Sequence, residues 1–156
     1  MHSNVELIDR FYSSFQKRDP EGMVACYHPE IAFSDPVFQD LRGERAGAMW
    51  RMLCARGKDL EVEFTGVRAD ETSGTAHWEA RYTFSTGRKV HNIIDANFEF
   101  QDGKIIKHTD TFDLRAWAGQ ALGLPGRLFG GTNMLQNKIR ATGMKGLEKF
   151  EKSRPQ

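Results

Sequence analysis

The sequence predicts a single α+β domain, because segments with helical periodicity come first and a run of strand-like segments follows them. The chain has 156 residues, enough for one domain with a substantial core. Short turn signals separate the later strands, so we expect these strands to be consecutive and antiparallel. One strongly curved sheet wrapped around the N-terminal helices would bury the apolar faces of both and leave a conical cavity.

The first third of the chain contains three expected helices. In the first, apolar residues recur at three- and four-residue steps: Leu7, Ile8, Phe11, Tyr12 and Phe15. The second is short, with Asp19 as N-cap and Pro20 in the first turn, and His28-Pro29 ends it. The third carries apolar side chains on one face. We expect these helices over residues 3–18, from Asp19 to His28, and over residues 44–56.

Five strand-like stretches accompany these helices. The first, residues 31–38, is interrupted by Pro36, which cannot donate to a ladder, so this strand lies at an edge or turns there. Thr86-Gly87 and Gln101-Asp102-Gly103 are hairpin signals between later strands. After Gly57 we expect strands over residues 60–68, 76–85, 90–101 and 104–112.

The C-terminal part returns to a helical pattern at Leu114. Glycines and Pro125 interrupt it before a last, weak helix over residues 133–152. We expect a domain core over residues 1–113 and a helical extension over residues 114–156 that packs on the same domain. From Arg115 onward there are eight Lys and Arg residues against two acids, typical of a solvated basic helix.

Composition excludes several classes of function. Hydrophobic residues make up 39% and charged residues 28%, and the net charge is +1, so nothing indicates a nucleic-acid partner. With no secretory leader and no apolar stretch of membrane-spanning length, we expect a cytoplasmic protein without a membrane partner. Cys26 and Cys54 are expected to be reduced core thiols.

Cofactor and metal signals are missing from the sequence. The chain carries no P-loop, nucleophile elbow or dinucleotide fingerprint, so we expect chemistry without a cofactor. His77 and His91 are spaced like strand residues and have no third ligand nearby, so we expect no metal.

Two aspartates in apolar, strand-like contexts are the first candidates for chemistry. Asp35 lies within Phe33-Ser34-Asp35-Pro36-Val37, and Asp95 follows Ile93 and Ile94, eight residues before Gly103. A carboxylate in such surroundings is costly to keep charged, which raises its pKa. A raised pKa suits a general base, or a protonated acid that donates a hydrogen bond.

The order of elements and four local motifs resemble the nuclear-transport-factor-2-like (NTF2-like) superfamily, in particular its SnoaL-like and ketosteroid-isomerase-like members. The resemblance covers roughly residues 5–113. It is carried by the opening helix with Asp19-Pro20-Glu21-Gly22, by Ser34-Asp35-Pro36-Val37, by Gly43 before a helix, and by Ile94-Asp95-x-x-Phe98-x-Phe100-x-x-Gly103-Lys104-Ile105. It implies a cone-shaped fold, a hydrophobic small-molecule ligand, and a homodimer formed through the sheet.

For the site, the resemblance implies that Asp35 is the general base and that Asp95 is a protonated acid in the oxyanion hole. The second oxyanion donor, a tyrosine, falls on Phe11, which has no hydroxyl group. Tyr12 is adjacent but points about 100° away around the helix. Losing such a donor typically costs about 2.7–4 kcal/mol of transition-state stabilisation.

Other polar residues could replace the missing donor. His108 and Asp110 alternate with Phe112, so all three share a face of the last strand. They look equivalent to the His and Asp used by SnoaL-like cyclases, but a hydrogen-bonded strand histidine and an ion-paired aspartate are the competing interpretations. Asn97 shares a face with Asp95 and is expected in the cavity if Asp95 is.

The strand over residues 76–85 has two competing faces. Glu79 and Arg81 lie on one of them, and Trp78 and Tyr82 lie on the other. If the polar face lines the pocket, Glu79 and Arg81 resemble the carboxylate–arginine set of limonene-epoxide-hydrolase-like members, with Asp110 as partner. A cross-strand ion pair on the exposed face is the alternative that alternation favours.

The sequence therefore predicts a cofactor-independent enzyme that abstracts a proton α to a carbonyl, an isomerase or cyclase, with Asp35, Asp95, His108 and Asp110 as catalytic candidates. The alternatives are an epoxide hydrolase and a protein that binds a hydrophobic ligand without chemistry. The residues expected to contact the substrate are Phe11, Tyr12, Phe15, Trp50, Asn97, Phe112 and Trp117.

Overall fold

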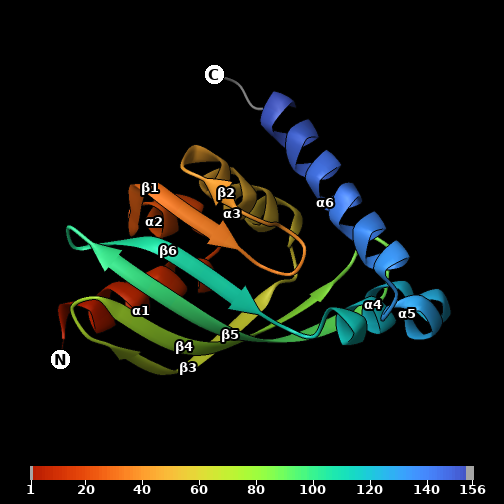
Figure 1. The fold of residues 1–156 in the computed structure, drawn as a ribbon, viewed down its shortest axis with the longest axis horizontal. Coiled ribbons are helices and arrows are strands. Elements are labelled where there is room, and N and C mark those ends of the chain that lie inside the picture. Colours follow the sequence, from red (N-terminus) through yellow and green to blue (C-terminus); the bar gives the residue numbers. More distant parts are fainter. Residues whose placement is uncertain (1, 154–156) are drawn as a thin grey trace.

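In the computed structural model, which describes residues 2–153, helices pack against one curved, open sheet of six strands (Figure 1). The strand order is β2-β1-β6-β5-β4-β3. This arrangement confirms the predicted α+β class. The strands are β1 (Tyr27–Ser34), β2 (Leu41–Arg42), β3 (Glu61–Ala69), β4 (Ser73–Thr83), β5 (Lys89–Gln101) and β6 (Lys104–Thr111).

The helices follow the predicted order with one addition. Asp19 caps α2 by accepting a hydrogen bond from the backbone N–H of Gly22, and Pro20 occupies its first turn, as predicted. The segment expected to be a plain break, Gly123 to Gly126, instead begins a short helix because Pro125 suits a first helical turn. The helices are α1 (Ser3–Gln16), α2 (Pro20–Val24), α3 (Glu44–Arg56), α4 (Leu114–Leu122), α5 (Leu124–Phe129) and α6 (Asn133–Ser153).

The sheet is mixed. Strands β3 to β6 form an antiparallel meander, as the hairpin signals predicted, whereas β1 pairs with β6 in parallel. Strand β1 begins at Tyr27, four residues before the predicted start, because its first residue already pairs with Ile105 of β6. Pro36 lies beyond the strand, in the turn that leads to β2. This turn is what places Asp35 at the end of β1.

Two apolar clusters form the core. The larger one lies between α1, α3 and the sheet, and it includes Phe11, Trp50 and Phe98. The smaller one joins α4 to the start of β5 around Trp117. Val37, Tyr82 and Phe112 pack against both clusters. Cys26 and Cys54 are free and buried, and burial raises the pKa of the Cys54 thiol to about 11.

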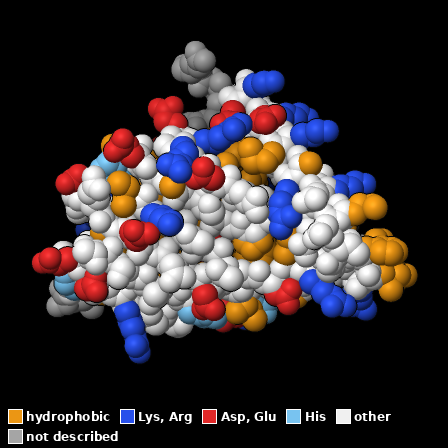
Figure 2. Space-filling view, in the orientation of Figure 1, with side chains coloured by type: hydrophobic (Ala, Val, Ile, Leu, Met, Phe, Trp, Pro, Cys, Tyr) orange, Lys and Arg blue, Asp and Glu red, His pale blue; other side chains and the backbone are white. Residues whose placement is uncertain are grey.

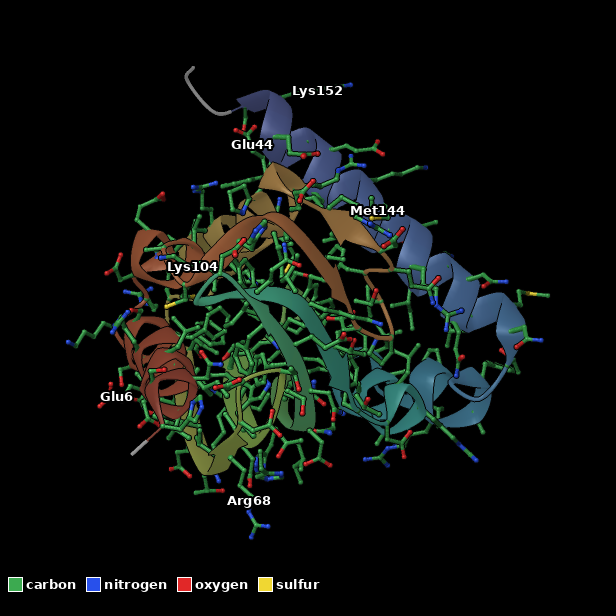
Figure 3. All side chains as sticks on the ribbon, turned by 60° about the vertical axis from the view of Figure 1, so that its left-hand side comes forward. Glu6, Glu44, Arg68, Lys104, Met144 and Lys152 are labelled. Carbon is green, nitrogen blue, oxygen red and sulfur yellow. The ribbon has the colours of Figure 1, made fainter. Side chains whose placement is uncertain are left out.

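Helix α6 runs from the α4–α5 end of the molecule back past β2 to α3 (Figures 1 and 3). Arg45 of α3 pairs with Glu151 of α6 at 3.0 Å, and Figure 3 shows the neighbouring Glu44 beside the same end of α6. Near its other end, Arg140 Nε donates a hydrogen bond to the carbonyl of Pro36 at 2.9 Å. Helix α6 thus contacts the turn that carries Asp35. Within residues 2–153, no helix is both long and apolar enough to cross a membrane.

Candidate functional site

Two polar side chains lie in the apolar interior on β6. The side chain of His108 is fully buried and Asp110 is 4% exposed. Both point to the face of the sheet that also carries Trp78 and Phe98, because β6 alternates buried and more accessible positions along its length. The sequence-based expectation that His108 and Asp110 share a face is therefore met, and the two are in direct contact.

A chain of hydrogen bonds connects these side chains to three aromatic residues. Trp50 Nε1 donates to Tyr27 Oη at 2.8 Å, and Tyr27 Oη lies 2.8 Å from His108 Nδ1. His108 Nε2 lies 2.9 Å from Asp110 Oδ1, which also accepts a 3.3 Å hydrogen bond from Trp78 Nε1. We call the set Trp50, Tyr27, His108, Asp110 and Trp78 the β6 relay.

The donors and acceptors of the relay favour one direction for each of its hydrogen bonds. Asp110 accepts at Oδ1, so His108 donates from Nε2 and its Nδ1 is free to accept the hydroxyl proton of Tyr27. Tyr27 Oη in turn accepts from Trp50. In this arrangement both ring nitrogens of His108, the hydroxyl of Tyr27 and both indole N–H groups have partners, and the imidazole of His108 is held in one tautomer.

Asp35 lies in the turn after β1 and is partly buried. Its Oδ1 accepts hydrogen bonds from the backbone N–H groups of Val37 at 2.7 Å and Phe38 at 2.6 Å. The pKa of Asp35 is raised to about 7. Burial is the main cause, the charge of Asp110 adds to the rise, and the two backbone donors oppose it. Asp35 is therefore close to half-ionised at neutral pH, which suits a general base.

The carboxyl groups of Asp35 and Asp110 are each held by hydrogen bonds to one oxygen, Oδ1. Asp35 Oδ1 takes two backbone donors, and Asp110 Oδ1 takes the donors of His108 and Trp78. Among the described residues, no hydrogen bond reaches the Oδ2 atom of either group. Each carboxyl is thus oriented through one oxygen and can offer the other to a ligand.

Tyr82 of β4 belongs to the same region. Its hydroxyl accepts a 2.8 Å hydrogen bond from Trp117 Nε1 of α4, which leaves its own proton free to be donated. Burial raises the pKa of Tyr82, the hydrogen bond from Trp117 lowers it, and the charge of Asp35 raises it. Tyr82 therefore brings a neutral hydroxyl donor within electrostatic range of Asp35.

The aromatic residues expected to contact a substrate form the packing around the relay. The ring of Phe11 lies 5.4 Å from that of His108, and Trp50 stacks on His108 at 6.1 Å. Phe11, Tyr12, Phe15 and Trp50 are all buried in the larger core cluster. Phe112 packs against both clusters, and Trp117 lies in the smaller one, where it donates a hydrogen bond to Tyr82.

The expectation that Asp95 shares a cavity with Asp35 is wrong. Its side chain is 76% exposed and lies on the opposite face of the sheet, where Oδ1 contacts His77 Nδ1 at 3.0 Å. The reason is strand parity: Ile94, Ala96 and Phe98 are the buried positions of β5, so Asp95 and Asn97 point outward. Asn97 is consequently not placed to contact a ligand beside Asp35.

Glu79 and Arg81 also lie on the outer face. Glu79 contacts His77 at 3.0 Å and His91 at 2.7 Å, and Arg81 pairs with Glu63 at 3.4 Å. The cross-strand ion-pair interpretation is therefore the correct one. Because Asp110 points to the interior, Glu79 and Arg81 cannot form a set with it, which removes the basis for the proposed epoxide-hydrolase arrangement.

Two residues of the site, Trp78 and Tyr82, were not among the sequence candidates. A signal was present for both, because they form the apolar face of their strand, the face that meets the core. Tyr27 was expected only as an apolar residue of a helix, so its hydrogen bonds to His108 and Trp50 were missed. Among residues 2–153, no group of three or more His, Cys, Asp or Glu side chains is placed to hold a metal ion.

Comparisons with known proteins agree with this fold. The family model of the SnoaL-like domain matches residues 8–108. A putative SnoaL-like polyketide cyclase from Jannaschia sp. CCS1 is similar in structure, with a TM-score of 0.67 and 19% identity over 79% of this chain and 93% of that one. An LEH-like epoxide hydrolase from M. tuberculosis has a TM-score of 0.66 and 20% identity, over 81% of this chain and 95% of that one.

TerC, co-crystallised with polyporic acid, gives a TM-score of 0.66 and 19% identity over 76% of this chain and 98% of that one. A sequence comparison with curated proteins gave no significant match. At these identities the structural matches establish the fold. The match of the family model over most of the chain establishes membership: this protein belongs to the SnoaL-like family of the NTF2-like superfamily.

Proposed function

We propose that this protein is a cofactor-independent enzyme that abstracts a proton from the carbon next to a carbonyl group in a hydrophobic small molecule. The observation that carries the proposal is Asp35, a carboxyl group held by two backbone donors whose pKa is raised to about 7, mainly by burial. Members of the family and similar structures named polyketide cyclases support a small-molecule reaction of this kind.

In the proposed step, Asp35 Oδ2 takes the proton and the C–H bonding electrons form an enolate. Tyr82 donates its hydroxyl proton in a hydrogen bond to the enolate oxygen, in place of the donor that Phe11 cannot provide. Burial is the main cause that holds the pKa of Asp35 near neutral, and Asp110, fixed by His108 and Trp78, adds to the rise. Reprotonation at another carbon gives an isomerase, and attack of the enolate on a second carbonyl gives a cyclase.

The substrate is proposed to enter where the two apolar clusters meet. Val37, Tyr82 and Phe112 belong to this junction, and Asp35 lies next to Val37 in the chain. Their side chains are partly exposed, whereas the aromatic residues around His108 are fully buried. An apolar, aromatic ketone matches such surroundings, because only its carbonyl and acidic C–H need polar partners.

Proton abstraction can be tested without knowing the product. A panel of aromatic β-diketones and cyclic enones in D₂O would be followed by proton NMR for loss of the signal at the carbon next to the carbonyl. We expect the protein to accelerate exchange of at least one compound, with a rate that rises with pH through about 7 as Asp35 ionises.

Three variants assign the roles. Asp35→Asn should reduce the exchange rate about 100-fold or more, and Tyr82→Phe about 10- to 100-fold. The matched control is Asp95→Asn, which changes a carboxyl on the outer face and should leave the rate unchanged. A ligand that binds but never exchanges, or equal rates for Asp35→Asn and the parent protein, would show a binding protein rather than this enzyme.

We also propose a homodimer formed through the outer face of the sheet. This face carries Ile93, which is 54% exposed, among charged residues of β4 and β5. Sedimentation velocity of the parent protein and of Ile93→Glu tests it: the parent should sediment as a dimer and the variant should shift toward monomer.

A further inference from the structure

Four exposed apolar side chains are concentrated at one end of the molecule. Among residues 2–153, five large hydrophobic residues are exposed, and four of them lie between Leu124 and Met134. Met134 is 84% exposed and Phe129 is 56% exposed. Figure 2 shows this patch as the projecting right-hand end of the molecule. We call it the α5 tip; it consists of Leu124, Leu128, Phe129 and Met134.

The exposure of the tip is built into the fold. A side chain at Gly126 would collide with the backbone carbonyl of Ala118, and one at Gly130 would collide with the carbonyl of Gly126. Because both positions are glycine, α5 packs directly on α4 and turns its apolar side chains outward. Gln136 Nε2 of α6 donates to the carbonyl of Gly130 at 2.9 Å, which fixes the junction. The packing of α5 on α4 and this hydrogen bond therefore fix the position of the tip.

Cationic side chains surround a hollow next to the tip. A concavity of about 500 Å³ between the start of β5 and helices α4 and α5 is lined by Arg88, Lys89, Arg115 and Arg127. Asp113 is the single acid in its lining. Lys89 pairs with Asp59 at 3.9 Å, whereas within the described part of the chain no ion pair involves the three arginines. Figure 2 shows blue side chains directly beside the orange tip.

Although the sequence alone indicated no membrane partner, we propose that the α5 tip and this cationic concavity together form a docking site for an anionic phospholipid surface. The apolar side chains would enter the boundary between headgroups and acyl chains, and Arg88, Arg115 and Arg127 would bind the phosphates. Stable attachment of a peripheral protein needs two signals, and an apolar insertion with a basic patch supplies them. The net charge of the whole chain is only +1, so the local excess of positive charge decides which face of the protein approaches the anionic lipid surface.

Charge complementarity favours this occupant over a second copy of the chain. A two-fold contact through the tip would bring Arg127 and Arg115 of both copies together, with Asp113 as the single acid of each concavity against its four cationic residues. The tip also projects, whereas the apolar anchors of protein–protein interfaces fill pockets on the partner. A lipid surface accepts a projecting apolar group without any matching pocket.

Vesicle co-sedimentation tests the proposal with the full chain. The probes are vesicles of phosphatidylcholine alone and vesicles of equal parts phosphatidylcholine and phosphatidylglycerol. We expect binding to the anionic vesicles that weakens as salt increases, and little binding to the neutral ones. Phe129→Glu, Met134→Glu and the double variant Arg115→Gln/Arg127→Gln should each lower the partition coefficient about tenfold.

A matched control variant distinguishes binding at this site from binding that depends only on the positive charge of the chain. Lys145→Gln/Lys149→Gln removes two charges from the far half of α6, away from the tip. It should bind like the parent protein. No binding to anionic vesicles would overturn the proposal, as would an equal loss in the control. A self-association that Phe129→Glu abolishes would also overturn it, by showing that a second copy covers the tip.

Discussion

Opposing influences act on the carboxyl group of Asp35. Burial removes water and raises the pKa, and the charge of Asp110 acts in the same direction. The backbone N–H groups of Val37 and Phe38 stabilise the ionised form and limit the rise. The result, a pKa of about 7, makes ionisation of this single residue affect the stability of the fold around neutral pH.

The pH dependence of stability should reveal this carboxyl. Its folded-state pKa of about 7 lies above the ordinary value of 3.8, so between these values the folded protein binds more protons than the unfolded chain. The free energy of unfolding should therefore fall as pH rises from about 4 to about 7, by up to about 4 kcal/mol, and then level off. Urea unfolding of the parent and of Asp35→Asn at pH 4, 5.5 and 8 measures the difference. If the free energy of unfolding changes with pH in the same way for both proteins, Asp35 is not the group responsible.

Two buried tyrosines offer a matched test of hydrogen bonding. Tyr27 Oη bonds to Trp50 and His108, whereas among the described residues Tyr12 Oη finds no partner. Tyr27→Phe leaves two buried polar groups without partners and should lower the free energy of unfolding by about 1–3 kcal/mol. Tyr12→Phe removes an unsatisfied group and should be neutral or stabilising by up to about 1 kcal/mol. Urea unfolding measures both, and equal losses would show that the relay contributes nothing to stability.

The candidate residues show what one sequence can and cannot settle. The shared face of His108 and Asp110 followed from alternation with Phe112, and the structure has this arrangement. Asp95 was misplaced because Ile93 and Ile94 are both apolar, so either parity of β5 was consistent with a buried face. Only pairing with β4 and β6 fixes that parity, and pairing depends on the whole sheet.

At the scale of elements, close backbone approach decides how the C-terminal helices pack. Gly126 lets α5 lie against the Ala118 carbonyl of α4, and any Cβ there requires a backbone shift. Gly126→Ala should therefore lower the free energy of unfolding by about 1–3 kcal/mol and increase amide exchange in α4 and α5. Gly131→Ala is the control, because its Cβ would meet only Arg115 side-chain atoms at ordinary contact distance. A loss equal to that of the control would mean that α5 does not pack on α4 in this way.

Long, strongly patterned elements were predictable and short ones were not. The meander of β3 to β6 followed from its alternation and hairpin turns, and α3 was found with its observed bounds. Strand β2 has only two residues, and β1 starts at Tyr27, directly before His28-Pro29, which looked like a helix end. These segments gain their structure from pairing with β1 and β6, respectively, which local propensity does not contain.

At the scale of the molecule, α6 connects the end of the chain to the turn that carries Asp35. Arg140 bonds to the carbonyl of Pro36, and Gly143 lies against Val37 and Phe38. These contacts cover one side of the turn. We therefore expect α6, which begins about 100 residues further along the chain, to contribute to the burial that raises the pKa of Asp35.

Displacing α6 should consequently lower the pKa of Asp35. A Cβ at Gly143 would lie 2.9 Å from Val37 Cγ1, so Gly143→Val pushes the helix away from the turn and admits water. We expect the pKa to move from about 7 toward its ordinary value of 3.8, as measured by ¹³C NMR titration of the carboxyl group. The control is Gly146→Val, one turn further along α6, where the new side chain would meet only the flexible end of Arg56. If Gly143→Val leaves the pKa unchanged while the fold is intact, burial by α6 is not its cause, and the charge of Asp110 becomes the main contribution to be tested by Asp110→Asn.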